Sequence, residues 1–503
     1  GVGDLRGVAG RLDYLEWLGI DAIWLNPIMP SPNADWGYDI SDYCGVHPEL
    51  GTLEDLKRLV AEAEDRGIRV LLDLVPNHTS NLHPWFIDSS SSRSSSRRDW
   101  YVWADPKRDG SPPNNWSSLL GGGPAWSLDP KTGQYYLHLF LPEQPDLNWW
   151  NPEVRSVFDK ILEFWFSKGI AGFRIDVAHG LIHDRKLRDN PPLGPDDHPE
   201  VSRHGQRLFY SMNRPEVHDI LARWRRLCER ADPARVLVGE TYLFDLEEMA
   251  RYYGAGADEL NLAFNFPFVF SELDGRTLSA VVEATEALFD RRHWPAWTAS
   301  NHDVGRFPSR WCRDDPEATR CVLMMLLTLR GTPFLYYGDE IGMGNSSVPR
   351  RRLRDPAALT QWPRNIGRDQ CRTPMPWSGR PGAAFTSAEV EPWLPFGDIA
   401  ACNVEDQRGD RGSTLHLCRD LIMLRRGNSA LVQGDYRVLK APEGIWAWER
   451  GEQFSVFLNM SNLGKTCPRV SGTVAIGTRR ERDGEQVNGT LDLQPWEGVV
   501  VRR

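Results

Sequence analysis

The chain has 503 residues, of which 41% are hydrophobic and 25% are charged, the composition of a globular protein with room for a large core. Its net charge of −10 argues against a general nucleic-acid or anionic-membrane binder. No run of about 18 apolar residues is present, so no membrane span is predicted. The eight cysteines lie far apart without a CxxC pair, so we expect reduced thiols and a cytoplasmic protein rather than a zinc site or disulfide scaffold.

The first two-thirds of the chain alternate short apolar runs with helical patterns, the rhythm of β/α units. Helical spacing from Leu5 to Leu18 and from about Thr52 to Arg66 precedes strand-like runs at 22–25 and 70–75. Asn151-Pro152 predicts a helix start, as an N-cap followed by proline in the first turn. Further strands are expected at 172–177, 236–239, 261–264, 297–300 and 333–337, with a short buried helix at 321–329. This repetition favours an α/β fold of the (β/α)8 TIM-barrel type over an open sheet.

Two stretches interrupt the rhythm, and the pattern changes near the end. Residues 77–150, with a serine-rich run and many prolines, predict an inserted domain B after the third barrel strand. Residues 343–401, rich in Arg, Pro and Gly, predict loops near the barrel mouth. From about Gly434 onward short alternating strands predict an antiparallel β domain. We therefore assign 1–76 and 151–430 to the barrel, 77–150 to domain B and 431–503 to a C-terminal β-sandwich.

Charged and polar residues follow four of the expected strands. They are Asp73 with Asn77 and His78, Arg174 with Asp176, Glu240, and His302 with Asp303. The carboxyl ends of barrel strands form one face, so these groups should converge on one mouth. A lone carboxylate there is most often a cap or ion-pair partner. Several together, however, are what glycosidic bond cleavage needs.

These residues also lie in recognisable motifs. DLVPNH at 73–78, GFRIDVAH at 172–179, VGET at 238–241 and SNHD at 300–303 resemble the four ordered motifs of glycoside hydrolase family 13, the α-amylase family. QPDLNWWNP at 144–152, GYDISDY at 37–43, GTPFLYYGDEIGM at 331–343 and RTPMPW at 372–377 are similar to stretches of its oligo-1,6-glucosidase and α-glucosidase branch. The resemblance spans nearly the whole chain in order, which makes chance agreement improbable.

The resemblance implies roles for three carboxylates. Asp176 would be the nucleophile that forms a covalent glucosyl ester, Glu240 the acid/base, and Asp303 the carboxylate that binds sugar hydroxyls and favours the distorted ring. Arg174, two residues earlier on the same strand, would hold Asp176 ionised and aimed. For a retaining mechanism the Asp176 and Glu240 carboxyls should lie about 5 Å apart.

The resemblance also implies a pocket closed around one glucose unit. His78 and His302 would hydrogen-bond that glucose, Tyr38 would stack on it, and Asp35 and Arg372 would bind its far hydroxyls. The alternative for the last three is a core tyrosine and a surface ion pair. Phe140 either supplies an aromatic wall or belongs to the core. Asp73 and Asn77 are assigned to scaffolding.

The N-terminus departs from the family pattern. The family begins with another strand and an Asp-rich metal-binding loop, so we expect the first barrel strand to lie upstream of Gly1. No cofactor is required by the resemblance. A structural calcium or magnesium ion could use Asp4 and a carbonyl near Val2, with its other ligands upstream.

The resemblance implies a retaining, exo-acting α-glucosidase that releases glucose from short α-glucosides of the maltose, sucrose or isomaltose type. Val177 leans towards α-1,6 linkages, whereas Ala178-His179 is closer to enzymes acting on maltose or sucrose. If the glucosyl group were transferred to a sugar, the protein would be a glucosyltransferase or a sucrose or maltose isomerase. An inactive barrel acting as a binding subunit predicts lost carboxylates, yet all three are present. A starch-binding module in the tail is supported only by scattered tryptophans.

Overall fold

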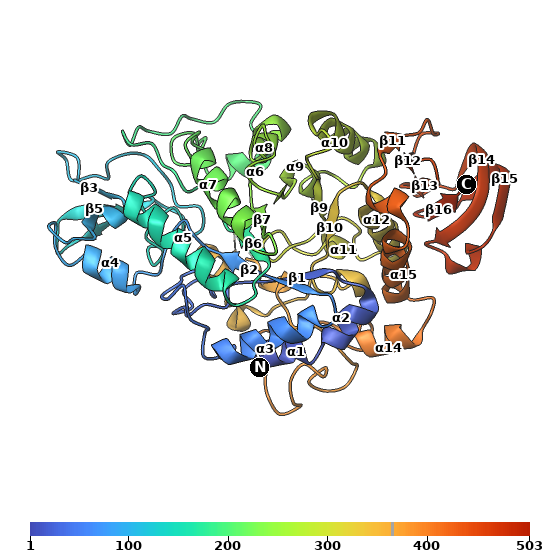
Figure 1. The fold of residues 1–503 in the computed structure, drawn as a ribbon, viewed down its shortest axis with the longest axis horizontal. Helices are drawn as coiled ribbons and strands as arrows, with labels where there is room; N and C mark the ends of the chain where they lie inside the picture. The colour runs from blue at the N-terminus through green and yellow to red at the C-terminus, as the bar shows by residue number, and fades with distance from the viewer. Residues whose placement is uncertain (364–366) are drawn as a thin grey trace.

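A computed structural model describes residues 1–363 and 367–503. Parallel strands alternating with helices form its centre (Figure 1). Five strands pair in the order β1-β2-β6-β7-β8, and β9 pairs with β10. A parallel bridge from Phe264 to Ala296 joins the two sets. Their bounds are Ala22–Leu25, Arg69–Leu74, Gly172–Ile175, Val236–Gly239, Leu262–Ala263, Ala296–Thr298 and Thr332–Phe334.

This is the architecture of a (β/α)8 barrel, as the alternating pattern predicts. Seven of its parallel strands lie within the described residues.

Helices surround the barrel strands, and the longer ones, such as α3, α5 and α7, bury an apolar face. Helix α3 starts at a capping box of Thr52 and Asp55, and α5 at the predicted Asn151 cap. The helices through the barrel region are α1 (Leu5–Ala9), α2 (Leu12–Leu18), α3 (Leu53–Glu64), α5 (Pro152–Phe166), α6 (Pro199–Ser202), α7 (Val217–Arg230), α8 (Leu246–Arg251), α9 (Phe266–Val269), α10 (Gly275–Leu288), α11 (Phe307–Arg310), α12 (Pro316–Thr328), α13 (Pro356–Gln361), α14 (Val404–Gly409), α15 (Thr414–Arg426) and α16 (Ser429–Val432).

Two predicted helices differ from the observed ones. The Leu5–Leu18 pattern is two helices, because α1 ends at a Gly10 cap and α2 starts two residues later. The predicted helix at 321–329 begins earlier, at Pro316, where the Asp315 side chain accepts hydrogen bonds from the amides of Glu317 and Ala318. The first turn contains charged residues, so an apolar pattern does not reveal where this helix starts.

The segment between β2 and α5 contains a small antiparallel sheet with α4 (Pro84–Ser89). Its strands are β3 (Trp103–Ala104), β4 (Trp126–Asp129) and β5 (Gln134–Leu137), in the order β3-β5-β4. This sheet and the C-terminal sheet lie at opposite ends of the long axis (Figure 1). The barrel, and with it the site described below, lies between them.

The C-terminal residues form one six-stranded antiparallel sheet in the order β11-β12-β13-β16-β14-β15. Its strands are Tyr436–Val438, Ile445–Arg450, Phe454–Asn459, Gly498–Arg502, Lys465–Gly477 and Gln486–Leu493 in that order. Trp446, Trp448 and Val456 pack with barrel helices, whereas Ala447 and Val499 join a separate apolar cluster with Leu491. Strands β12, β13 and β16 are therefore buried on both faces, whereas β11, β14 and β15 have exposed residues.

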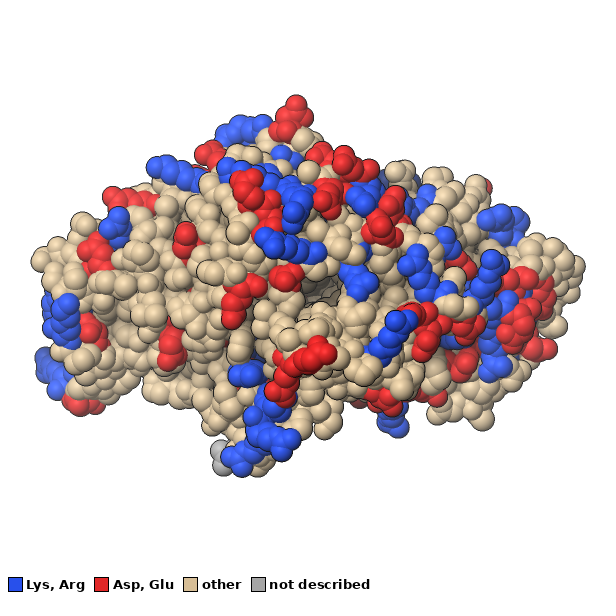
Figure 2. Space-filling model, turned by 90° about the horizontal axis from the view of Figure 1, so that it is seen from below, with Lys and Arg blue, Asp and Glu red and all other residues tan. Residues whose placement is uncertain are grey.

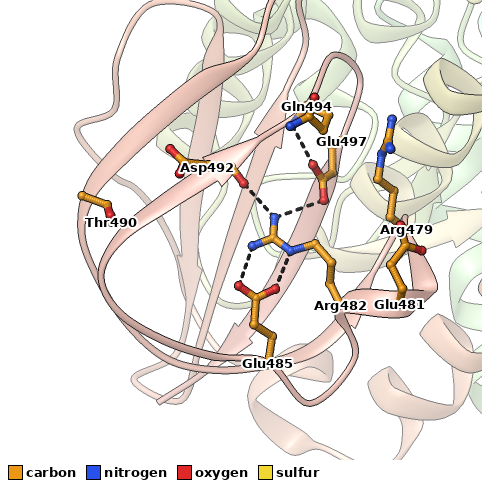
Figure 3. A pocket seen from close by; sticks show the side chains of 8 residues that line it. All are labelled: Arg479, Glu481, Arg482, Glu485, Thr490, Asp492, Gln494 and Glu497. Atoms are coloured by element: carbon orange, nitrogen blue, oxygen red, sulfur yellow. Dashed lines mark hydrogen bonds and ion pairs between the residues drawn. The ribbon is translucent and has the colours of Figure 1, made fainter.

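A hollow on this C-terminal sheet is lined by polar and charged side chains (Figure 3). Arg482 forms a two-bond ion pair with Glu485 and a further one with Glu497. None of the eight lining residues is aromatic. Because sugar-binding surfaces use aromatic faces, this hollow gives no support to a starch-binding module.

All eight cysteines are free thiols. In the part of the chain that the structure describes, no helix combines the length and apolarity needed to cross a bilayer. The space-filling view shows a hollow near the centre of one face, with acidic and basic side chains around it (Figure 2).

Candidate active site

Strand register places Asp176 and Glu240 side by side. Ile175, the last residue of β6, pairs with Gly239, the last residue of β7, and each carboxylate directly follows its strand. The backbone continues this pairing, since the Glu240 amide donates to the Ile175 carbonyl at 2.9 Å. A Cβ on Gly239 would lie 2.3 Å from Leu260 Cδ1, so glycine permits the close packing just before Glu240.

Arg174 binds three carboxylates. It is the register partner of Asp73 on β2, and its Nη1 lies 2.9 Å from Asp73 Oδ1 and 2.6 Å from Asp176 Oδ1. Its Nη2 lies 2.9 Å from Glu240 Oε2. The Arg174 side chain is 2% exposed and lies over the Trp24 ring. One buried cation therefore joins the predicted nucleophile and the predicted acid/base.

The charges in this cluster set its protonation. Burial raises the pKa of Asp73 to about 7, although Arg174 favours the carboxylate. Burial likewise raises the pKa of Asp176 against the same guanidinium. Three carboxylates around one guanidinium favour retention of a proton within the cluster. A site that both donates and accepts protons needs such a proton.

The residue after Asp176 has an unusual backbone. Val177 has φ of 45°, in the left-handed region that β-branched residues rarely adopt. This conformation directs its amide to Glu240 Oε2 at 3.0 Å, and the next amide, of Ala178, donates to the Glu240 carbonyl. The turn after Asp176 thus holds Glu240, the predicted acid/base, in place through two backbone amides.

Tyr38 and His302 connect the Arg174 cluster to Asp303. The Tyr38 hydroxyl donates to Asp73 Oδ2 at 3.0 Å and lies 2.7 Å from His302 Nε2, and the two rings are parallel within 6°. His302 Nε2 is 3.2 Å from Asp303 Oδ2. Burial lowers the pKa of His302 to about 3, so the imidazole is neutral near pH 7.

Two arginines and two carboxylates form what we call the end wall: Asp35, Asp303, Arg368 and Arg372. Arg372 Nη2 binds Asp303 Oδ1 at 2.8 Å and its Nε donates to the His302 carbonyl. Arg368 binds Asp303 at 3.1 Å and Asp35 at 2.7 Å. Burial opposes the Asp303 charge, but His302, Arg368 and Arg372 outweigh it and hold the pKa of Asp303 below its usual range.

Gln144 and Phe140, from the segment between β2 and α5, also contact the network. The Gln144 amide lies 3.4 Å from Asp35 Oδ2 and 3.0 Å from His78 Nε2. The Phe140 ring is 5.2 Å from the His78 ring, and the side chain also packs against the apolar cluster of domain B. Phe140 therefore belongs both to the site and to that cluster.

All ten residues that the sequence predicts for catalysis and substrate binding fall into one contact network. Asp35 and Arg372 are buried, so they do not form a surface ion pair. Tyr38 takes part in the network and also belongs to the main apolar core cluster, as the alternative expected. The sequence analysis missed Arg368, Gln144 and Asp355, which binds Arg368. Gln144 opens a recognised motif, and Arg368 lies four residues before Arg372 in a stretch without regular periodicity.

The predicted metal ligands lie apart from this network. Asp4 Oδ1 accepts a hydrogen bond from the Gly7 amide at 2.6 Å and caps α1, and Val2 is exposed. Among the described residues no group of three or more His, Cys, Asp or Glu side chains is placed to hold a metal. The ion at the N-terminal loop stays a prediction.

Comparison with known proteins gives the same assignment as the motifs. The model of the α-amylase catalytic domain matches residues 1–434. The chain is 40% identical to a probable α-glucosidase of Rhizobium meliloti, over 93% of this chain and 86% of that one. It is 35% identical to the oligo-1,6-glucosidase of Parageobacillus thermoglucosidasius, over 100% and 95%.

Among solved structures, the α-glucosyl transfer enzyme XgtA superposes with a TM-score of 0.92 at 37% identity, covering 100% of this chain and 95% of that one. Sequence and structural similarity thus extend over both the barrel and the terminal sheet. The chain belongs to the α-amylase family, glycoside hydrolase family 13, in the branch that contains the α-glucosidases and oligo-1,6-glucosidases.

Proposed function

We propose that the protein is a retaining, exo-acting α-glucosidase that removes glucose from the nonreducing end of short α-glucosides. The observation that carries the proposal is the pair Asp176 and Glu240, one residue beyond register partners and bound to the same Arg174. This arrangement favours the carboxyl separation of about 5 Å that retention requires.

In the first step Asp176 attacks the anomeric carbon while Glu240 gives its proton to the leaving oxygen. The glycosidic bond breaks, and a glucosyl ester with Asp176 forms. In the second step Glu240 takes a proton from water, whose oxygen attacks the anomeric carbon and releases Asp176 and α-glucose. Arg174 stabilises each carboxylate as its charge returns.

The end wall supports exo action. Asp35 and Arg372 are 4% and 8% exposed, so these two residues of the end wall are buried. Charged hydrogen-bonding groups at the closed end suit the hydroxyls of a terminal glucose. Asp303 and the neutral His302 would bind hydroxyls of the same unit.

Transfer of glucose to a sugar is a second candidate. Transfer uses the same glucosyl ester, and the ratio of transfer to hydrolysis depends on how well the acceptor side excludes water. The similarity to an α-glucosyl transfer enzyme supports this candidate. For the linkage we propose α-glucosidase action on maltose or sucrose type substrates, because Ala178-His179 follows Val177.

Proton NMR of separate reactions with maltose, isomaltose and sucrose tests these proposals. Initial release of α-glucose supports the retaining hydrolase and identifies the linkage. Longer or isomeric sugars that precede free glucose would instead support transfer or isomerisation. Initial release of β-glucose, or failure to cleave any α-glucoside, would contradict the proposal.

A further inference from the structure

His183 and Asp146 form a buried pair that joins two separate parts of the chain. Asp146 lies in the segment between β2 and α5, and His183 lies on the loop that follows β6 and the predicted nucleophile. His183 Nε2 is 3.2 Å from Asp146 Oδ2, and the two side chains are 4% and 0% exposed. Within the described residues, neither of these two atoms has a hydrogen-bond partner elsewhere. Each atom therefore depends on the other to offset the cost of its burial.

The second ring nitrogen of His183 indicates how the imidazole is protonated. Nδ1 lies 2.8 Å from the Ser211 carbonyl, which can only accept, so Nδ1 carries a proton. In a neutral imidazole Nε2 would then be bare, and its lone pair would lie beside the Asp146 carboxylate. A second proton, on Nε2, replaces this repulsion by attraction between an imidazolium and a carboxylate. The geometry therefore favours a charged His183.

The other charged groups nearby leave the balance of Asp146 to His183. In the described part of the chain, Asp146 has no ion pair with a lysine or an arginine. Two more histidines face this carboxylate, but burial lowers the pKa of both, so they stay neutral near pH 7: His78 and His138. Beside His183, the Asp184 carboxylate is already paired with Arg188 at 2.6 Å.

The segment around Asp146 also supports the predicted glucose site. The Leu139 amide donates to Asp146 Oδ1 at 3.0 Å, and the Leu147 amide donates at 2.9 Å to the carbonyl just before His78. Two residues before Asp146, the Gln144 amide lies 3.0 Å from His78 Nε2. A shift of Asp146 would therefore displace the surroundings of His78.

We propose that charged His183 is a positioning residue, which holds the segment that carries Gln144 against the loop after β6 and so keeps His78 in place for the substrate. This inference rests on the proposed function. His183 acts through Asp146, so its loss should raise KM more than it lowers kcat. Loss of its proton at higher pH should have the same effect, because a buried carboxylate would be left without its counter-charge.

The test compares His183→Gln with His218→Gln, a matched change in another histidine–carboxylate pair. His218 Nδ1 lies 2.7 Å from Glu259 Oε2, outside the active-site network. The assay uses an α-glucoside that the wild type cleaves. At about pH 6 the KM of His183→Gln should exceed the wild-type value about tenfold, and the ratio should approach one by about pH 8, where the wild-type imidazole has lost its proton. His218→Gln should follow the wild type at both pH values.

His183→Lys tests whether the charge itself is needed. Lysine keeps its charge to about pH 10, so the KM of His183→Lys should match the wild type at about pH 6 and lie below it at about pH 8. If His183→Gln does not fold, a KM of His183→Lys above the wild-type value at both pH values overturns the proposal.

Hydrogen exchange gives a readout that does not depend on activity. At about pH 6 the Leu139 and Leu147 amides should exchange about tenfold faster in His183→Gln than in His218→Gln. Equal exchange in these two variants, or a ratio of KM values that does not change with pH, would overturn the role of His183. A wild type that cleaves no α-glucoside overturns the proposed function, whereas the exchange comparison would still test the pair, so the two failures are distinguishable.

Discussion

Burial and an ion pair have opposite effects on the pKa of the Asp176 carboxyl group. Burial raises the pKa of its carboxyl, and Arg174 at 2.6 Å favours the charged form. A nucleophile held in this way is poorly solvated and oriented before substrate arrives. Asp73 shares the Arg174 cation with Asp176.

Asp176→Asn should abolish turnover and keep the fold. An amide cannot form the glucosyl ester, so we expect kcat to fall by more than about 10⁴-fold. Arg174 keeps Asp73 and Glu240 as partners, so no buried cation is left unpaired. Circular dichroism and thermal melts should match the wild type. Asp21→Asn, at an exposed carboxylate, is the control, and wild-type-like turnover in Asp176→Asn would contradict the assignment.

The loop from Ser31 to Asp39 determines where Asp35 and Tyr38 lie. It winds around the fully buried Asp39 carboxylate, which accepts hydrogen bonds from the Ser31 hydroxyl and from the amides of Ala34 and Asp35. Within it Trp36 has φ of 49°, in the left-handed region. Backbone strain of this kind persists only where surrounding contacts hold it.

Asp39→Asn should therefore impair binding more than chemistry. The amide nitrogen that replaces one oxygen cannot accept from the backbone, so the loop loses part of its anchor. We expect KM to rise about tenfold with a smaller change in kcat, measured well below the melting temperature. Ser31→Ala removes one of the three bonds and should have a lesser effect. An unchanged KM in a folded Asp39→Asn variant would show that the loop does not need this anchor.

The sequence predicts features that depend on residues close together in the chain, but not contacts between residues far apart in it. Strand β1 has the predicted bounds, and β6 and β7 begin where apolar runs meet Gly172 and Val236, because local patterns dictate them. The catalytic carboxylates could be found because they follow such strands within ordered motifs. Arg368 could not, since its bond to Asp35 joins residues 333 positions apart, and no local pattern encodes that pairing.

Across the molecule as a whole, a buried arginine, Arg450, attaches the terminal sheet to the barrel, and a second, Arg425, binds the same helix end from within the barrel. Arg450 on β12 donates to the carbonyls of Thr328 and Gly434, and Arg425 on α15 donates to those of Leu327 and Leu329. The Thr328 and Leu327 carbonyls lie at the end of α12, where helical acceptors lack partners. The arginines thus donate hydrogen bonds to carbonyls at the buried end of α12.

Arg450→Met should lower stability and spare catalysis. Loss of charged hydrogen bonds to buried carbonyls should reduce the free energy of unfolding by about 3 kcal/mol. Thermal melts should show the loss, while kcat at 25 °C stays at the wild-type value because the active site lies outside this contact. Arg276→Met, at an arginine that is 84% exposed and faces an exposed glutamate, should melt like the wild type. Equal melting of both variants would contradict the role of Arg450.

The proposed mechanism depends above all on covalent attachment of glucose to Asp176. A 5-fluoro-α-glucosyl fluoride probes this step, because the fluorine at C5 slows both steps and the fluoride leaving group speeds only the first, so the ester accumulates. Mass spectrometry of the quenched enzyme should show one fluoroglucosyl group, on the peptide that contains Asp176. Attachment to any other residue, or turnover with β-glucose as the first product, would contradict the mechanism.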